Sequence, residues 1–276
     1  MSSAAVGRDL VLTYGQRVAV DRSSFEIPYD SITAVIGPNG SGKSTLLNAL
    51  AGLLKPERGR LEVLGDTPDR ARRRIAYVVQ TTKVNEALPV TVREVVIMGR
   101  YTTTGAYRLL SQVDRSAVET ALQRLDLAHL TRRHLRELSG GERQRVFVAQ
   151  GLAQDREMLL LDEPFTALDL VSAHTIDEVL RDERAAGRSV VVTTHSLAEA
   201  QAADHVLLLS QRVVASGPPE AALTLDALRA AYGPRVTDIE GRVFIDDAAH
   251  EPAAARHVHQ ERSLHVEPPG SGLHDE

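Results

Sequence analysis

The sequence predicts an α/β fold with a mostly parallel sheet, and three observations support this prediction. Strand-like apolar runs alternate with helical patterns in the second half of the chain, which is typical of parallel strands covered by helices. The region from about Leu10 to Ile36 is rich in short β-like runs. Between about Thr81 and Arg136 the apolar periodicity becomes helical. We therefore expect a parallel core, an antiparallel N-terminal β region and an inserted α-helical subdomain.

The individual elements follow from local patterns. The β-like runs of the first region occupy 9–15, 17–27 and 31–37, and the last of them leads into an apolar-periodic helix at 44–54. Strand-like runs follow at 60–65 and 73–80, and the clearest helices of the next block are 91–99 and 115–127. Later strands are expected at 157–162, 189–195 and 204–210, with helices at 171–187 and 196–203 between them. We expect one domain over 1–246, with the helical subdomain inserted at about 81–153.

Composition excludes several classes of protein. With 276 residues, 43% of them hydrophobic and 25% charged, the chain can bury a large core. A net charge of -5 without a strongly basic stretch argues against a non-specific nucleic-acid binder. The chain has no cysteine, which excludes disulfides and thiolate zinc sites and suits a reducing compartment. The N-terminus carries no apolar signal core and the longest apolar runs are of strand length, so we expect a chain that is soluble by itself.

The last segment, 247–276, differs in composition from the rest of the chain. It is polar and rich in Pro, Gly and His, so we expect a disordered or loosely attached tail. The histidines of this tail are His250, His257, His259, His265 and His274. Two of them, His257 and His259, could bind Zn²⁺ or Ni²⁺ weakly through their imidazole nitrogens. A solvated tail with chance histidines explains the same pattern.

The stretch GPNGSGKST lies between the strand ITAVI and a helix, which is the setting that a Walker A phosphate-binding loop requires. Its glycines allow backbone N–H groups to converge on phosphate oxygens, and the helix N-terminus adds partial positive charge. The lysine can reach the β- and γ-phosphates, and the serine that follows it can ligate Mg²⁺. The residues expected at the nucleotide are Gly37, Pro38, Asn39, Gly40, Ser41, Gly42, Lys43, Ser44 and Thr45.

The stretch EMLLLDEP supplies the second half of a phosphate-hydrolysing site. An apolar strand carries Asp162 at its C-terminal end, where the carboxylate can hold Mg²⁺ through water. Glu163 follows directly, and a carboxylate there can accept a hydrogen bond from a water molecule and polarise it for attack on the γ-phosphate.

A second anion-binding pattern occurs about a hundred residues after the first. In LSGGERQR, Ser139 is suited to cap a helix, and Gly140 and Gly141 allow the backbone to approach a phosphate closely. Glu142 begins the helix, whose N-terminus would point at the bound charge. A capped helix with no ligand would not explain two adjacent glycines at a position where they weaken the helix.

The order of these motifs resembles the ATP-binding subunit of an ABC transporter, over roughly Leu10 to Gly217. The resemblance implies a P-loop NTPase fold of the ABC ATPase type. It also implies a head-to-tail homodimer, in which the Ser-Gly-Gly turn of one copy faces the P-loop of the other and ATP lies between them. Such an arrangement is isologous, and neither site is complete within one chain.

Further positions match the family residue by residue. Tyr14 resembles the aromatic residue that stacks on adenine, although a single tyrosine near a strand is as often part of a core. Gln80 resembles the Q-loop glutamine that contacts Mg²⁺ and the attacking water, and Asp169 the D-loop aspartate that communicates across the dimer. His195 resembles the switch histidine at the γ-phosphate. The catalytic set that the resemblance implies is thus Glu163, His195, Lys43 and Gln80, with Ser44, Gln80 and Asp162 at Mg²⁺.

The sequence departs from the family pattern at three positions. Val79 lies where many relatives have proline, and Gln150 with Gly151 occupies a place where Arg-Ala is common. None of these residues belongs to the predicted chemistry, so we expect full ATPase activity.

The resemblance also predicts partners and cargo. An ATPase without a membrane span must pass its work to a transmembrane permease, which the segment after Gln80 is expected to contact. An extracytoplasmic substrate-binding protein would complete the system, and the subunit would lie on the cytoplasmic face of the bacterial inner membrane. The sequence resembles most the importers of metal ions, zinc or manganese, and those of iron-siderophore or haem chelates. An exporter and a non-transport ABC ATPase are the remaining alternatives.

Overall fold

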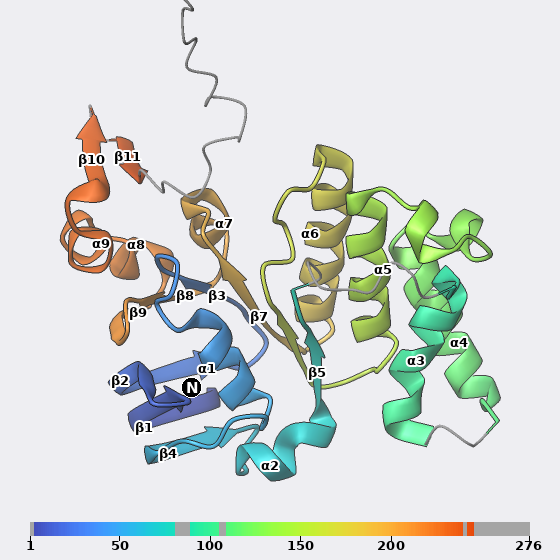
Figure 1. Ribbon diagram of the computed structural model, residues 1–276, viewed down its shortest axis with the longest axis horizontal. Helices are drawn as coiled ribbons and strands as arrows, with labels where there is room; N and C mark the ends of the chain where they lie inside the picture. The colour runs from blue at the N-terminus through green and yellow to red at the C-terminus, as the bar shows by residue number, and fades with distance from the viewer. Residues whose placement is uncertain (1–2, 81–88, 105–108, 240–241, 246–276) are drawn as a thin grey trace, which may run out of the picture.

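The centre of the molecule is a six-stranded sheet with the strand order β5-β6-β7-β3-β8-β9 (Figure 1). All neighbouring strands run parallel except β8 and β9. The computed structural model describes residues 3–80, 89–104, 109–239 and 242–245. The strands of this sheet are β3 (Ile32–Ile36), β5 (Ile75–Val78), β6 (Met158–Leu161), β7 (Ser189–Thr194), β8 (His205–Leu209) and β9 (Val213–Gly217).

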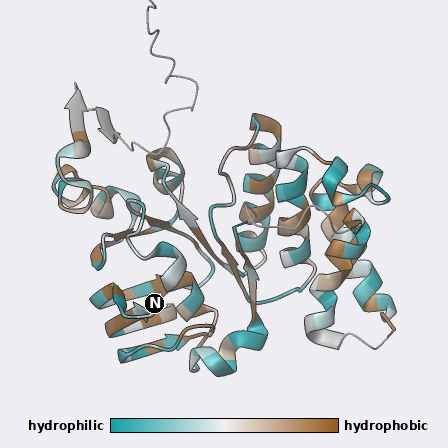
Figure 2. Cartoon of the chain, in the orientation of Figure 1, coloured by the Kyte–Doolittle hydropathy of each residue, from teal (hydrophilic) through white to brown (hydrophobic). Residues whose placement is uncertain are grey.

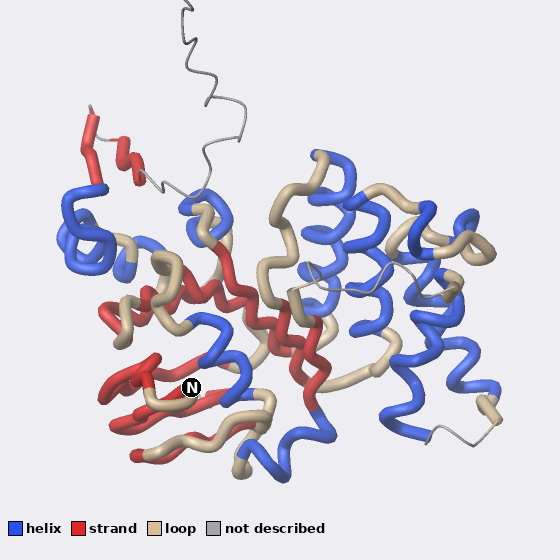
Figure 3. The backbone as a smooth tube through the Cα atoms, in the orientation of Figure 1, coloured by secondary structure: helices blue, strands red, loops and turns tan. Residues whose placement is uncertain are grey.

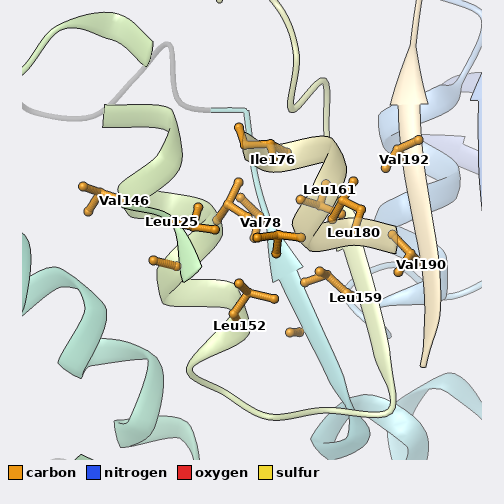
Figure 4. Packing of buried hydrophobic residues seen from close by; sticks show 14 of the residues in the cluster. Val78, Leu125, Val146, Leu152, Leu159, Leu161, Ile176, Leu180, Val190 and Val192 are labelled. Carbon is orange, nitrogen blue, oxygen red and sulfur yellow. The ribbon is translucent and has the colours of Figure 1, made fainter. Parts of the chain in front are cut away.

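The core strands are apolar along their whole length because both faces of the sheet are covered. In β3, Ala34 and Ile36 pack on one side of the sheet, whereas Val35 between them packs on the other. The two-residue period of a strand produces this division. Figure 4 shows the first side, where side chains of β6 and β7 meet α5 and α6. In Figure 2 the same strands form a continuous apolar band through the centre of the chain.

A three-stranded antiparallel sheet with the order β2-β1-β4 lies against the second side of the core. It is formed by β1 (Ser3–Tyr14), β2 (Arg17–Pro28) and β4 (Arg58–Val63). Helix α1 (Lys43–Leu50) packs into the same apolar cluster through Leu46, Leu47 and Leu50. The expected antiparallel N-terminal region is therefore confirmed, and β1 begins earlier than the sequence pattern predicts.

Between β5 and β6 the described chain is helical, and its helices gather at one end of the molecule, away from the antiparallel sheet (Figure 3). They are α3 (Val92–Thr104), α4 (Gln112–Arg124) and α5 (Gly140–Leu152). The guanidinium of Arg100 on α3 forms a buried ion pair with Asp114 on α4 at 2.7 Å and donates to the carbonyl of Ala153 at the end of α5. This one side chain therefore links all three helices, and we propose that they form the inserted subdomain of about 81–153.

A second cluster of charges connects these helices to the core. Glu183 on α6 (Leu170–Ala185) is buried and accepts hydrogen bonds from Arg124 of α4 and from Arg188, each at 2.5 Å. Arg188 also donates to Asp155, which follows α5. A buried carboxylate needs such partners because desolvation disfavours its charged form. The cluster therefore joins the last residue of α4 to α6, the helix that covers the core sheet.

The C-terminal part of the described chain contains elements that the sequence patterns did not predict. They are β9, α8 (Pro219–Ala222), α9 (Leu225–Tyr232) and a hairpin of β10 (Val236–Ile239) and β11 (Arg242–Ile245). Helices α2 (Pro68–Ala71) and α7 (Leu197–Gln201) complete the fold. The predicted tail, with His257 and His259, lies outside the described residues. No helix in the described part of the chain has both the length and the apolar character needed to cross a bilayer.

Candidate functional site

The loop between β3 and α1 is held in a conformation that only glycine tolerates at one key position. Gly42 has φ +104°, and a Cβ there would lie 2.5 Å from the carbonyl oxygen of Ala19 on β2. A backbone hydrogen bond from the N–H of Ser41 to the carbonyl of Pro38 closes the turn. The amine of Lys43 is buried and donates to the carbonyl of Gly37 at 2.7 Å, which holds it over the loop.

A pocket of about 300 Å³ opens directly above this loop. Its wall combines the loop, the β1–β2 hairpin and Glu163, the second residue after β6. The exposed ring of Tyr14 lies on one side, at 74% exposure, and Glu163 lies on another. The residues that line it are Tyr14, Arg17, Ala19, Asn39, Gly40, Ser41, Gly42, Lys43, Ser44, Thr45 and Glu163.

A hydroxyl group on β7 organises the two carboxylates that follow β6. Thr193 Oγ1 donates to Asp162 Oδ1 at 2.6 Å and accepts the backbone N–H of Glu163 at 2.8 Å. Asp162 is itself buried, and its N–H pairs with the carbonyl of Val78 on β5. Glu163 adopts φ +50°, a left-handed conformation that is uncommon for a residue with a Cβ. Strain of this kind is characteristic of functional sites, and here it accompanies a carboxylate on the wall of the pocket.

The side chain of Glu163 is oriented by two further donors. Gln80, at the end of β5, donates its side-chain N–H to Glu163 Oε2 at 2.8 Å, and Thr166 Oγ1 donates to the same oxygen at 3.3 Å. Strands β5 and β6 are neighbours, and their carboxyl ends meet at one edge of the sheet. The structure thus brings Gln80, Asp162 and Glu163 together beside the loop of β3.

The pocket fits a polyphosphate with its cation. Ser41 Oγ is buried and has no hydrogen-bond partner in the described chain, although it belongs to the loop that forms the floor of the pocket. A buried polar atom of this kind calls for a ligand, because leaving it unpaired costs about 1–3 kcal/mol. The amine of Lys43 and the N–H groups at the N-terminus of α1 are hydrogen-bond donors, which suits an anion. The hydroxyl of Ser44 and the carboxylate of Asp162 are oxygen ligands of the kind that Mg²⁺ prefers.

A comparison with protein-family models gives one match, to the ABC transporter model, over residues 20–166. This span begins before the phosphate-binding loop and ends after the two carboxylates of the pocket.

The chain belongs to the ABC transporter family.

Curated relatives match this ABC chain over most of its length. It is 38% identical over 245 residues to the chelated iron transport system membrane protein YfeB of Yersinia pestis, covering 87% of this chain and 83% of that protein. It is 36% identical over 225 residues to the manganese transport system ATP-binding protein MntB of Listeria monocytogenes, covering 81% and 94%. Among solved structures, an inward-facing transporter of the metal-chelate ABC type matches with 30% identity and a TM-score of 0.74, covering 88% of this chain and 96% of that one. The predicted P-loop NTPase fold of the ABC ATPase type is therefore confirmed.

The second glycine pair of this ABC chain lies at the start of α5. Ser139 is the N-cap, its hydroxyl accepts the N–H of Glu142, and Glu142 Oε2 accepts the N–H of Ser139 at 2.8 Å. This reciprocal capping lowers the pKa of the Glu142 carboxyl, first through the backbone hydrogen bond from Ser139. Ser139 and Gly140 are exposed, and a Cβ at Gly140 would meet nothing within 4 Å. The turn is therefore open to solvent at Ser139 and Gly140.

Gly141 connects this turn to the start of α6. A Cβ there would collide with the side chains of Asp169 and Ser172. Asp169 caps α6 by accepting the N–H of Ser172 at 2.8 Å, and this bond is the main reason that its pKa is lowered. Within one chain the LSGGERQR stretch and the D-loop aspartate Asp169 thus lie together. In the described chain, none of Ser139, Gly140, Gly141, Glu142 or Asp169 lines the pocket above the phosphate-binding loop.

His195 follows β7 and is half-buried. Burial raises the pKa of Glu199 on α7; electrostatic interaction with His195 lowers this pKa and that with Glu163 raises it, so His195 and Glu163 both lie near this carboxylate. The predicted set is therefore divided between two places. The first place contains Tyr14, the loop 37–45, Gln80, Asp162 and Glu163, with His195 nearby. The second contains Ser139 to Glu142 with Asp169.

Sequence reasoning missed several residues of the site, including Ala19 and Thr166. Arg17 reaches the pocket because the tight β1–β2 turn pairs it with Tyr14, and the Gly15-Gln16 spacing was the available signal. Thr193 is inconspicuous within the apolar run SVVVTT, and the neighbouring strand alone reveals its role. Glu199 is one of two polar residues on a helix of five residues. Within the part of the chain that the structure describes, no group of three or more His, Cys, Asp or Glu side chains could hold a metal ion.

Proposed function

We propose that this chain binds and hydrolyses ATP to power an ABC transporter that imports a metal ion, Zn²⁺ or Mn²⁺, through a separate permease. The observation that carries the proposal is the pocket in which Glu163 faces the phosphate-binding loop while Gln80 and Thr166 hold its carboxylate. A carboxylate oriented from two sides can act as a general base on a water molecule beside a γ-phosphate.

The residues of the pocket divide the work of hydrolysis. Ser41 Oγ, the loop N–H groups and Lys43 bind the phosphates and stabilise the charge that develops on them. Tyr14 offers its exposed ring to the adenine. Ser44, Asp162 and Gln80 would hold Mg²⁺, which neutralises charge on the phosphate oxygens when bound. Glu163 takes the proton of the attacking water, and His195 supports the γ-phosphate from the end of β7.

We propose that a second copy completes each site. The Ser139–Gly140 turn is exposed at the N-terminus of α5, and a helix N-terminus is suited to an anion. Next to it, Leu170 and Val171 are exposed at 89% and 71%, although they are large and apolar. Exposed apolar side chains beside an anion-binding turn favour a protein interface. In a two-fold dimer this face of one copy would cover the nucleotide of the other. Hydrolysis removes the shared charge, and the difference in affinity between the two states provides the work.

A groove of about 780 Å³ offers a docking place for the permease. Leu53 and Val79 expose apolar surface in it, and Val79 directly precedes Gln80. Its rim carries Arg72, Arg73 and Arg156, and burial lowers the pKa of Arg156. An acidic, partly apolar segment of the permease complements this lining. Movement of that permease segment would be transmitted to Glu163 through Gln80. The segment 81–88, which was expected at this contact, lies outside the described residues.

Reversing two charges of the groove tests this docking. We expect Arg72→Glu with Arg73→Glu to weaken association with the permease more than about tenfold, because like charges at an interface cost several kcal/mol. Arg58→Glu with Arg60→Glu on β4, outside the groove, is the matched control. Co-purification with the permease and the ATPase rate of the free subunit are measured. Equal loss of permease in both double variants would contradict the assignment.

The cargo follows from the relatives and from the motifs together. The Listeria relative is named for manganese transport, which supports a divalent metal ion. The Yersinia relative is named for chelated iron, and an iron chelate is therefore the second candidate. We propose an extracytoplasmic binding protein as the third component. The subunit would lie on the cytoplasmic face of a bacterial inner membrane, held there by the permease.

Uptake measurements in the native host test the cargo. Deleting this chain should abolish high-affinity uptake of labelled Zn²⁺ or Mn²⁺, and the wild-type chain should restore it, whereas Glu163→Gln should not. Labelled iron chelate is measured in parallel. Loss of chelate uptake alone would favour the second candidate, and increased retention of metal in the deletion strain would indicate an exporter.

A further inference from the structure

Glu199 occupies an unusual position at the start of α7. The N-cap of this helix is Ser196, whose hydroxyl accepts the N–H of Glu199 at 3.3 Å. In the capping boxes of α4 and α5 the acidic residue at this position accepts the N–H of the N-cap in return. Glu199 does not: its carboxylate instead accepts the hydroxyl of Thr194, the last residue of β7, at 2.6 Å.

In a capping box the acidic side chain would accept the N–H of the N-cap residue, but here another group is the acceptor. The N–H of Ser196 donates to Thr194 Oγ1 at 2.8 Å. Thr194, Ser196 and Glu199 therefore form a closed ring of hydrogen bonds around the backbone of His195. Since Thr194 Oγ1 both donates and accepts, it is fixed in rotation, and so is the strand-to-helix turn.

The surroundings of Glu199 explain why its carboxylate points toward the strand. It lines a cavity of about 540 Å³ between α6 and α7, where Arg181 is paired with Asp177 and Arg184 with Asp204. His174 lies on the same wall. His195 and Glu163 are near enough to interact electrostatically with Glu199. Burial raises the pKa of Glu199, which favours a short bond from a strong local donor such as Thr194.

We propose that Glu199 is a positioning residue that sets the orientation of His195 by holding the turn from β7 to α7 through Thr194. This role rests on the proposed ATPase function. The Glu199 side chain acts as a hydrogen-bond acceptor, so a neutral amide of the same shape preserves the ring of hydrogen bonds. If Glu199 acted only through its negative charge, an amide could not take over its role.

Four variants test the proposal in steady-state ATPase assays. We expect Glu199→Ala to lower kcat about tenfold with KM changed less than about twofold, which is well within the effect of a 1 Å misplacement of a catalytic group. Glu199→Gln should retain more than about half of kcat. Thr194→Val should match Glu199→Ala, and the double variant should be no slower than either, because both changes open the same ring.

Controls separate this proposal from general loss of stability and from failure of the proposed function. Thr224→Ala removes the N-cap of α9, remote from the pocket, and should lower Tm without changing kcat. Absence of ATP hydrolysis in the wild-type chain would refute the proposed function, and wild-type hydrolysis in both His195→Ala and Glu163→Gln would refute the roles proposed for these two residues. If both variants are inactive while Glu199→Ala keeps kcat within twofold, if Glu199→Gln is as slow as Glu199→Ala, or if the Thr194 and Glu199 effects multiply, the positioning role is wrong.

Discussion

Replacement of Glu163 by glutamine is expected to abolish ATP turnover and to leave ATP binding intact. Glutamine keeps the shape of the side chain and can still meet Gln80 and Thr166, but it cannot take a proton from water. Loss of a general base costs about 10²–10⁴-fold in rate. The phosphate-binding loop and Lys43 do not depend on Glu163, so affinity for ATP is retained. Phosphate release and equilibrium binding of ATP measure the two quantities.

The same variant should accumulate as a dimer when ATP is present. Slow hydrolysis preserves the charge that joins the two copies, and size-exclusion chromatography with and without ATP reports the dimer. Glu178→Gln on α6 makes the same chemical change at an exposed carboxylate paired with His174, and it should behave as wild type. A Glu163→Gln protein that binds ATP and remains monomeric would contradict the shared site.

Replacement of Ser139 by arginine is expected to lower hydrolysis by at least about 100-fold while each copy still binds ATP. A long cation at the exposed turn blocks the approach of N–H donors to the phosphates of the neighbouring copy, and removal of such donors costs about 10²–10³-fold. The pocket above the chain's own P-loop is not lined by Ser139, so binding to the separated subunit should be unaffected.

The chain offers a matched control for this variant. Ser111 caps α4 in the same type of capping box, with Asp114 in the place of Glu142, and it is exposed. Ser111→Arg therefore removes an equivalent cap of equivalent exposure on another helix, whose Asp114 is connected through Arg100 to the end of α5 opposite Ser139. Hydrolysis should fall only in Ser139→Arg. Equal losses in both variants would mean that the cap, and not contact with a second copy, is what the activity requires.

Sequence patterns predicted the parts of the molecule that depend on local chemistry. The apolar runs of β3, β6, β7 and β8 are buried on both faces, so their composition alone identifies them. The loop at 37–45 combines glycines with Lys43 in an order that few other structures require. Gln80 was expected at Mg²⁺, and the structure brings its side chain to Glu163 at the neighbouring ends of β5 and β6.

The parts that sequence patterns did not predict depend on contacts between distant elements. Thr193 organises Asp162 and Glu163 only because β6 and β7 are paired in register. Strand β9 is half-exposed and short, and its signal is weak without β8 beside it. The burial of Glu183 requires Arg124 and Arg188 from two other elements, which no local pattern indicates.

The close contact of Gly141 with Asp169 and Ser172 has a consequence for how this surface can evolve. Any side chain at Gly141 would separate the two turns, so neither can drift without a compensating change in the other. The Ser139 turn and the start of α6 are thereby inherited as one piece, and a related subunit could change this surface only by replacing both together.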